Sequence, residues 1–199
     1  MKQTLKLWAV VPILSVFLLN GCANTDKKEN PETTDNTLTQ ETETAETAKD
    51  NTLSDSIVFE GTDMNGNAVS SEVFSDSKLT MVNVWATYCN PCLNEMPGLG
   101  ELAGEYDPDN FQIIGIISDV MEGADAETMD NATALVEMTG ADYTHLLLNE
   151  SVYYALLTDV TAVPTTFFVN ENGEVVDTVI GAMEKTAWEE KINALLENS

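Results

Sequence analysis

Two cysteines with two residues between them, Cys89 and Cys92, are the side chains whose types and spacing most directly indicate chemistry. The apolar run 79–85 before them is typical of a buried strand, and Pro91 suits the first turn of a helix. Cys89 therefore falls at a strand-to-helix junction, where unpaired backbone N–H groups and the helix dipole favour a thiolate. We expect Cys89 to be the nucleophile and Cys92, one turn deeper, to resolve the disulfide that Cys89 forms.

Other uses of a cysteine pair fit the sequence less well. A structural zinc site needs about four ligands, and the remaining candidates are Cys22 and the single histidine, His145. A purely structural disulfide across two residues closes too small a loop to restrict the unfolded chain much. The methionines at 121, 129 and 138 are typical of core packing rather than of a soft-metal site. We therefore expect a redox-active pair without metal or bound cofactor, and a structural or surface role for His145.

The first residues have the pattern of an export signal. A short basic start precedes a nearly apolar run at 7–19, which is shorter than the roughly 20 residues of a membrane span. The sequence Leu19-Asn20-Gly21-Cys22 resembles a bacterial lipoprotein signal, in which cleavage precedes a cysteine that becomes lipid-modified. We expect a signal peptide at 1–21 and lipidation of Cys22. A plain secretory signal followed by an unrelated cysteine is the alternative.

Composition separates a tether from a folded domain. Residues 22–56 are acidic, rich in threonine and poor in large apolar side chains, so we expect a lipid-anchored disordered linker there and one domain at 57–199. The whole sequence has 8 basic and 34 acidic residues, a formal charge of −26 and no arginine. Nucleic-acid binding and attraction to anionic lipid both need clustered cations and are disfavoured, which leaves a covalent anchor as the expected membrane attachment.

The domain alternates strand and helix patterns around the cysteines, which predicts an α/β fold. The first part is expected to hold a strand at 57–60, a turn at 63–67 that returns through 68–69, and a helical turn capped by Ser70 or Ser71. The further expected elements are a strand at 79–86, a helix from the cysteines to Tyr106 with a kink at Pro97, a strand at 111–117, a helix at 126–138 ended by Gly140, extended chain at 143–148, a helix capped by Ser151 that runs to Leu157, a hairpin of 165–169 and 174–180, and a helix at 185–196.

These motifs together resemble the thioredoxin fold, and specifically the TlpA/ResA family of membrane-anchored extracytoplasmic thiol-disulfide oxidoreductases. The segments that match the family's pattern are Asn83-Val84-Trp85-Ala86-Thr87, Cys89-Asn90-Pro91-Cys92, Glu95 with Pro97, Val163-Pro164-Thr165, and Asn170-Glu171-Asn172-Gly173-Glu174-Val175. Tyr88 departs from the pattern by replacing the usual tryptophan. The resemblance implies a thioredoxin-like fold, in which a central mixed β-sheet is flanked by helices, with an N-terminal β-hairpin and a helical insert at 126–138.

The resemblance also implies roles for individual residues. Glu95 lies one turn past Cys92 and is expected to tune the thiol pKa or relay a proton, because Asn83 stands where plain thioredoxin carries a buried aspartate. A solvated helix charge is the alternative reading of Glu95. Pro164 is expected to form a cis-proline loop against the sulfurs. The expected substrate-binding residues are Trp85, Tyr88, Asn90, Pro91 and Val163.

At the level of function, the resemblance implies a monomeric reductase of partner-protein disulfides outside the cytoplasmic membrane. Expected clients are apocytochrome c or an extracytoplasmic methionine sulfoxide reductase, and the expected electron donor is a membrane protein of the CcdA/DsbD type. A peroxiredoxin-like peroxidase is one alternative, disfavoured because no arginine is present to polarise peroxide. A Sco-like copper chaperone is another, disfavoured because its pattern spaces the cysteines by three residues. The direction of electron transfer stays open, since dithiols of this fold span about −270 to −120 mV.

Overall fold

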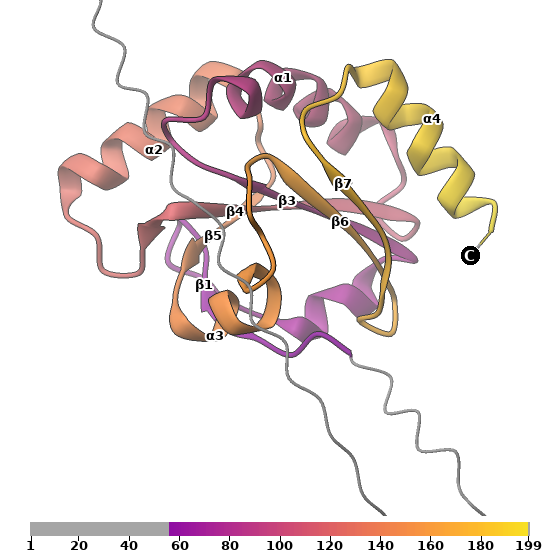
Figure 1. Ribbon diagram of the computed structural model, residues 1–199, viewed down its shortest axis with the longest axis horizontal. Helices are drawn as coiled ribbons and strands as arrows, with labels where there is room; N and C mark the ends of the chain where they lie inside the picture. Colours follow the sequence, from indigo (N-terminus) through magenta and orange to yellow (C-terminus); the bar gives the residue numbers. More distant parts are fainter. Residues whose placement is uncertain (1–55, 199) are drawn as a thin grey trace, which may run out of the picture. The chain divides into compact units, whose positions relative to one another are not determined.

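The computed structural model describes residues 56–198 of the chain (Figure 1). The signal peptide expected at 1–21, the linker that follows it and the lipidation site Cys22 lie outside the described residues, so these remain expectations. Within 56–198, none of the helices combines the length and the apolar character needed to cross a bilayer.

Five strands form a central mixed sheet, as expected from the sequence. Their order is β5, β4, β3, β6, β7. The three strands β3, β4 and β5 are parallel to one another, whereas β6 is antiparallel to both β3 and β7. The bounds are β3 (Leu79–Trp85), β4 (Phe111–Met121), β5 (Thr144–Leu148), β6 (Thr165–Asn170) and β7 (Val175–Ile180).

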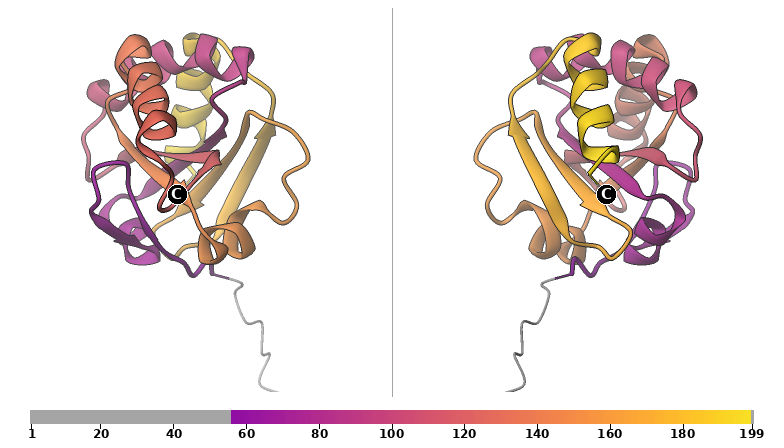
Figure 2. Two further views of the ribbon diagram at one scale, coloured as in Figure 1. Left: turned by 90° about the vertical axis from the view of Figure 1, so that its left-hand side faces the viewer. Right: turned by 90° about the vertical axis from the view of Figure 1, so that its right-hand side faces the viewer.

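Helices cover both faces of this sheet (Figures 1 and 2). One face carries three helices: α1 (Asn90–Glu105), α2 (Ala126–Thr139) and α4 (Lys185–Leu196). The other face carries η1 (Ser71–Asp76), α3 (Glu150–Val152), η2 (Tyr153–Leu157) and a small hairpin of β1 (Glu60–Thr62) and β2 (Ala68–Ser70). The predicted insert is thus α2, and it ends as expected at Gly140, whose φ of 66° is favourable for glycine.

Strand β3 positions the cysteines because it is the middle strand and every one of its residues is buried. Successive side chains alternate between the two faces. Val82 and Val84 pack in the cluster on the face opposite α1, whereas Met81 and Trp85 belong to the clusters on the face that α1 covers. The chain therefore leaves β3 at Trp85 on the face where α1 begins.

Three elements differ from the sequence expectation by two residues or more. Strand β1 starts at Glu60 rather than Ile57, because the antiparallel ladder with β2 begins there and Ile57 instead donates its N–H to the carbonyl of Gly173. Strand β4 continues four residues past Ile117. The helix after β5 is capped by Asn149 rather than Ser151, since the Asn149 side chain accepts the N–H of Val152.

Candidate active site

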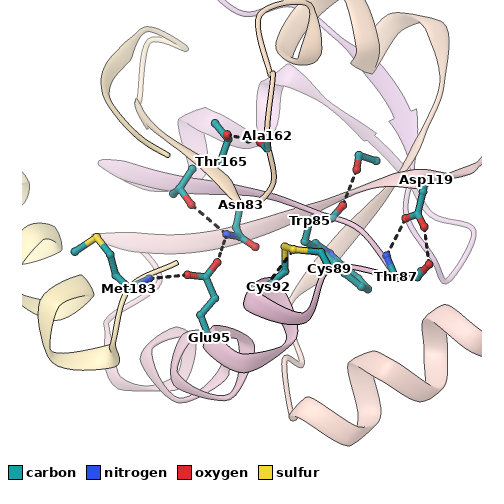
Figure 3. Close-up of a disulfide and its surroundings, with 12 residues drawn as sticks. Asn83, Trp85, Thr87, Cys89, Cys92, Glu95, Asp119, Ala162, Thr165 and Met183 are labelled. Atoms are coloured by element: carbon teal, nitrogen blue, oxygen red, sulfur yellow. Dashed lines mark hydrogen bonds between the residues drawn. A yellow bond between two sulfur atoms is a disulfide. The ribbon is translucent and has the colours of Figure 1, made fainter. Parts of the chain in front are cut away.

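The two cysteines lie at the junction of β3 and α1 and are joined by a disulfide, with 5.3 Å between their Cα atoms (Figure 3). Cys89 is the N-cap of α1, and its sulfur accepts the N–H of Cys92 at 3.2 Å. The exposed fraction is 5% for Cys89 and 0% for Cys92. An incoming sulfur can therefore reach Cys89 but not Cys92, and the cap position favours a thiolate on Cys89 once the disulfide is reduced.

The loop between β3 and Cys89 is held by the end of β4. The hydroxyl of Ser118 donates to the carbonyl of Trp85 at 2.9 Å. The carboxylate of Asp119 accepts the N–H of Thr87 at 3.0 Å and also its hydroxyl (Figure 3). Sequence analysis missed both residues, because the strand pattern stopped at Ile117. The continuation of β4 fixes the approach of the chain to the nucleophile.

A cis-proline loop lies next to the disulfide. The peptide bond between Val163 and Pro164 is cis, as the resemblance implies. Val163 packs against the apolar cluster that contains both cysteines. The loop is braced on each side, since Thr165 donates its hydroxyl to the carbonyl of Ala162 at 2.7 Å (Figure 3) and the carbonyl of Pro164 accepts the N–H of Gly181 at 2.8 Å.

Glu95 points from α1 into the protein rather than into solvent (Figure 3). One carboxylate oxygen accepts the side-chain amide of Asn83 at 3.0 Å, and the other accepts the N–H of Met183 at 3.1 Å and the indole N–H of Trp188 at 3.2 Å. Burial raises the pKa of Glu95, and these three hydrogen bonds offset part of that rise. The solvated-charge interpretation of Glu95 is therefore wrong.

Two of the donors to Glu95 come from the C-terminal part of the chain. Met183 precedes α4, and Trp188 lies within it. The sequence placed Trp188 only on the apolar face of the last helix, because periodicity indicates burial and says nothing of the partner of a buried indole. Pro91, Glu95 and Met183 also line a surface groove.

The expected substrate-binding residues divide into two groups. Tyr88, Asn90 and Pro91 are exposed, and Tyr88 and Val163 together line a surface groove beside the disulfide. Trp85, in contrast, has no exposed surface. The expectation that Trp85 binds substrate needs correction, because its indole packs behind the cysteines in the same cluster instead of beside them at the surface.

Sequence analysis expected a structural or surface role for His145 and did not connect it with the cysteines. Its ring is buried, and its Nδ1 atom accepts the indole N–H of Trp85 at 3.1 Å. The sequence does contain an indication of this contact, namely Gly115 in the middle of the buried strand β4. A Cβ atom on Gly115 would lie 2.2 Å from Nδ1 of His145, so the glycine leaves space for the imidazole.

Within the described residues, the histidine, cysteine and carboxylate side chains do not gather into a group of three that could hold a metal ion. His145 uses both ring nitrogens in contacts with the protein, to Trp85 and to the carbonyl of Ala141. Cys89 and Cys92 use their sulfurs in the disulfide. The arrangement is thus suited to thiol chemistry.

Comparisons with known proteins agree with this geometry. Residues 54–178 match the family model described as AhpC/TSA family. The chain is 28% identical over 115 residues to the thiol-disulfide oxidoreductase ResA of Halalkalibacterium halodurans, covering 58% of this chain and 61% of the relative. It is 30% identical over 121 residues to the thiol:disulfide interchange protein HelX of Rhodobacter capsulatus, covering 61% of this chain and 62% of the relative. The chain thus spans about three fifths of the length of these curated relatives.

Solved structures share the fold. A thiol:disulfide interchange protein of the thioredoxin family from Chlorobium tepidum superposes with a TM-score of 0.59 at 22% identity, covering 71% of this chain and 94% of that structure. StoA from Bacillus subtilis superposes with a TM-score of 0.53 at 19% identity, covering 67% of this chain and 94% of that structure. The thioredoxin-like fold expected from the sequence is confirmed.

Proposed function

Since this chain belongs to the AhpC/TSA family, we propose that it is a thiol-disulfide oxidoreductase of the ResA and HelX type, and that it reduces disulfides in partner proteins. The observation that carries the proposal is the placement of the cysteines. A slightly exposed cysteine at the N-cap of α1 is bonded to a fully buried one, beside a cis-proline loop. That arrangement suits a two-step exchange.

In the first step, the thiolate of reduced Cys89 attacks one sulfur of the client disulfide. An S–S bond forms between Cys89 and the client, and the other client sulfur leaves as a thiolate that takes up a proton. In the second step, Cys92 loses its proton and attacks the sulfur of Cys89, which releases the second client thiol and restores the Cys89–Cys92 disulfide. Two electrons thus pass from the protein to the client.

Glu95 is the proposed proton acceptor for Cys92. It lies one helical turn from Cys92, its pKa is raised by burial, and it lines a surface groove together with Met183. A carboxylate with a raised pKa is a stronger base than an ordinary one, so it can take a proton from a thiol and later return it to water. The Cys92 thiolate forms more readily when Glu95 accepts its proton.

The client is proposed to bind at the cis-proline loop. Val163 lies two residues before Thr165, the first residue of β6, so its peptide groups lie beyond the sheet ladder and can pair with an extended client segment. The adjacent groove between Tyr88 and Val163 can take an apolar side chain of that segment. Asn90 and Pro91 are exposed at the start of α1 and complete the contact surface.

The cellular setting follows from the N-terminal pattern and from the relatives' names. We propose a signal peptide at 1–21, a lipid anchor at Cys22 and a monomeric domain outside the cytoplasmic membrane. A membrane protein of the CcdA/DsbD type would return the domain to the dithiol state. Clients would be apocytochrome c or an extracytoplasmic methionine sulfoxide reductase. Such clients present a disulfide between protein cysteines, which matches an exchange that begins at Cys89.

Trapping in cells that produce the full chain tests the proposal. Cys92→Ser removes the resolving thiol, so mixed disulfides between Cys89 and clients are expected to accumulate on non-reducing gels and to disappear on reduction. The matched control is the double variant Cys89→Ser, Cys92→Ser, which cannot form them. If the single variant accumulates no more adducts than the double variant, the exchange mechanism is wrong.

Two measurements on the purified protein complete the test. Equilibration with glutathione gives the reduction potential of the Cys89–Cys92 pair. Dithiols of this fold span about −270 to −120 mV, and a reductase is expected near the lower end of that range. The peroxidase alternative is tested by hydrogen peroxide consumption with an excess of dithiol. Peroxide turnover faster than the reduction of a protein disulfide would overturn the proposal in favour of that alternative.

A further inference from the structure

His145 reaches from one strand to another across the sheet. It lies on β5, and Trp85 lies at the end of β3, with β4 between them. The β4 residue paired with His145 is Gly115. Because Gly115 has no side chain, the imidazole crosses over β4 and meets the indole of Trp85, with 5.6 Å between the ring centroids.

The partners of His145 determine its protonation. The indole N–H of Trp85 can only donate, so Nδ1 must carry a lone pair. Nε2 lies 2.9 Å from the carbonyl of Ala141, which can only accept and also receives the N–H of Tyr143. Both contacts are satisfied together only by the neutral imidazole with its proton on Nε2.

A proton added to Nδ1 would face the indole N–H, and the hydrogen bond to Trp85 would be lost. Burial lowers the pKa of His145, while the carbonyl of Ala141 and the charge of Asp142 act in the opposite direction. The neutral form therefore holds at neutral pH and gives way only in acid.

Few ionisable groups surround the ring. The Tyr143 ring contacts it in a tilted arrangement, with 4.5 Å between ring centroids and 32° between the ring planes. Burial, aided by the charge of Glu95 on α1, raises the pKa of Tyr143. Asp142 precedes Tyr143 in the same loop. Asp63 lies in the β1–β2 turn that pairs with the backbone of His145, but its carboxylate is engaged by N–H groups of its own turn. His145 is thus the group here whose titration acts directly on Trp85.

We propose that His145 is a positioning residue of the redox site: in its neutral form it accepts the indole N–H of Trp85 and so holds the indole against the Cys89–Cys92 pair. The proposal rests on the function proposed above and adds to it a residue that never touches the client. Protonation of His145 releases Trp85, loosens the packing behind the cysteines and slows exchange. Protonation of His145 therefore lowers the exchange rate in acid by a route that is separate from the titration of Glu95.

Two substitutions at His145 separate the contribution of the hydrogen bond to Trp85 from the contribution of ring packing. His145→Asn keeps an acceptor near the position of Nδ1 and cannot be protonated, whereas His145→Phe keeps an aromatic ring and has no acceptor. Trp85→Phe removes the donor and identifies the indole resonance of Trp85 in ¹H–¹⁵N spectra. The indole of Trp188, which donates to Glu95, is an internal reference that reports on the carboxylate.

The expected result has a spectroscopic part and a kinetic part. In the native protein, the indole N–H resonance of Trp85 moves as the pH falls below 6.5, the ordinary imidazole pKa. The rate of exchange with a disulfide, divided by the thiolate fraction of Cys89 measured by alkylation at the same pH, falls about fivefold over the same range, as expected for the loss of one buried hydrogen bond. In His145→Asn, neither the Trp85 resonance nor the exchange rate per thiolate shows this change with pH. His145→Phe exchanges slowly at every pH, and Asn restores most of the rate that Phe loses.

Several outcomes would overturn the proposal. These are a Trp85 resonance that does not move between pH 7.5 and 4.5, an Asn variant whose exchange rate per Cys89 thiolate still falls in acid as in the native protein, or a Phe variant as fast as the native protein. If His145→Phe fails to fold, the pH titrations of the native protein and of His145→Asn still test the proposal. Failure of the proposed function has a different signature, because the Trp85 resonance would then titrate in a protein that exchanges no disulfide at any pH.

Discussion

At the scale of single residues, the pair of Asn83 and Glu95 is the feature with the clearest consequence. The amide nitrogen of Asn83 donates to Glu95 and also to the hydroxyl of Thr166, each at 3.0 Å, while its amide oxygen is buried and has no hydrogen-bond partner among the described residues. This orientation suits an ionised Glu95. If Glu95 takes up a proton, a flip of the amide presents the oxygen as an acceptor, and the Thr166 hydroxyl can donate to it. Asn83 can thus serve both states of Glu95.

Glu95→Gln is expected to shift the pH dependence of Cys89 alkylation in the reduced protein. The variant carries no charge near the cysteines and takes no proton from Cys92, so the alkylation rate should rise with pH over a single step at lower pH than in the native protein. Measured rates of iodoacetamide labelling from pH 5 to 10 test this. An unchanged profile would remove Glu95 from the mechanism.

The same substitution has an effect on stability whose sign follows from the raised pKa of Glu95. A carboxyl group with a folded pKa above its unfolded value contributes stability that is complete below the unfolded value of about 4.5 and is lost as the pH rises through the folded pKa. The free energy of unfolding of Glu95→Gln minus that of the native protein should therefore increase with pH in this window and then level off. Urea unfolding at several pH values measures it, and a difference that decreases with pH would contradict the burial of the charge.

At the scale of elements, the sequence predicts the site in outline because its main signals are local. Cap chemistry located Cys89 and Gly140, apolar periodicity located α4 with its bounds, and the turn around Gly173 located the hairpin of β6 and β7. The contacts that complete the site are not local. Asp119 reaches Thr87 across 32 residues and His145 reaches Trp85 across 60. The Asp119 pairing leaves no pattern in one sequence, and Gly115 indicates space beside β4 without naming the side chain that fills it, so both partners were identified only from the folded chain.

The end of β4 offers a test at this scale. Asp119→Ala removes two hydrogen bonds from the loop that precedes Cys89, and we expect the free energy of unfolding to fall by about 1 kcal/mol and the amide of Thr87 to exchange with solvent faster. Asp119→Asn is the matched control, because its amide oxygen still accepts the N–H of Thr87 and its nitrogen can donate to the hydroxyl. Equal protection of Thr87 in the native protein and the Ala variant would show that Asp119 does not hold the loop.

At the scale of the whole molecule, charge is the dominant property. The sequence carries a formal charge of −26, and two of the three lysines in residues 57–199 form ion pairs with carboxylates of the same domain. Lys185 contacts Glu101 and Glu105, and Lys191 contacts Asp177. The field that a client meets is therefore negative. Such a field raises the local concentration of cations and lowers that of anions, by factors of about 10 to 10³ for a strongly charged surface.

Small disulfides of matched size test whether this field selects clients. The reduced protein should react faster with the dication cystamine than with the dianion bis(2-carboxyethyl) disulfide, by about tenfold or more at 10 mM salt, where the Debye length is about 30 Å. In 1 M salt, where it is about 3 Å, the ratio should approach the intrinsic reactivity difference measured with a small free dithiol. The neutral bis(2-hydroxyethyl) disulfide should react at a rate that salt does not change.

A cystamine advantage that persists in 1 M salt would assign the preference to a contact at the groove instead of the field. If salt removes the advantage, the chain's acidity favours clients whose disulfide lies on a basic surface.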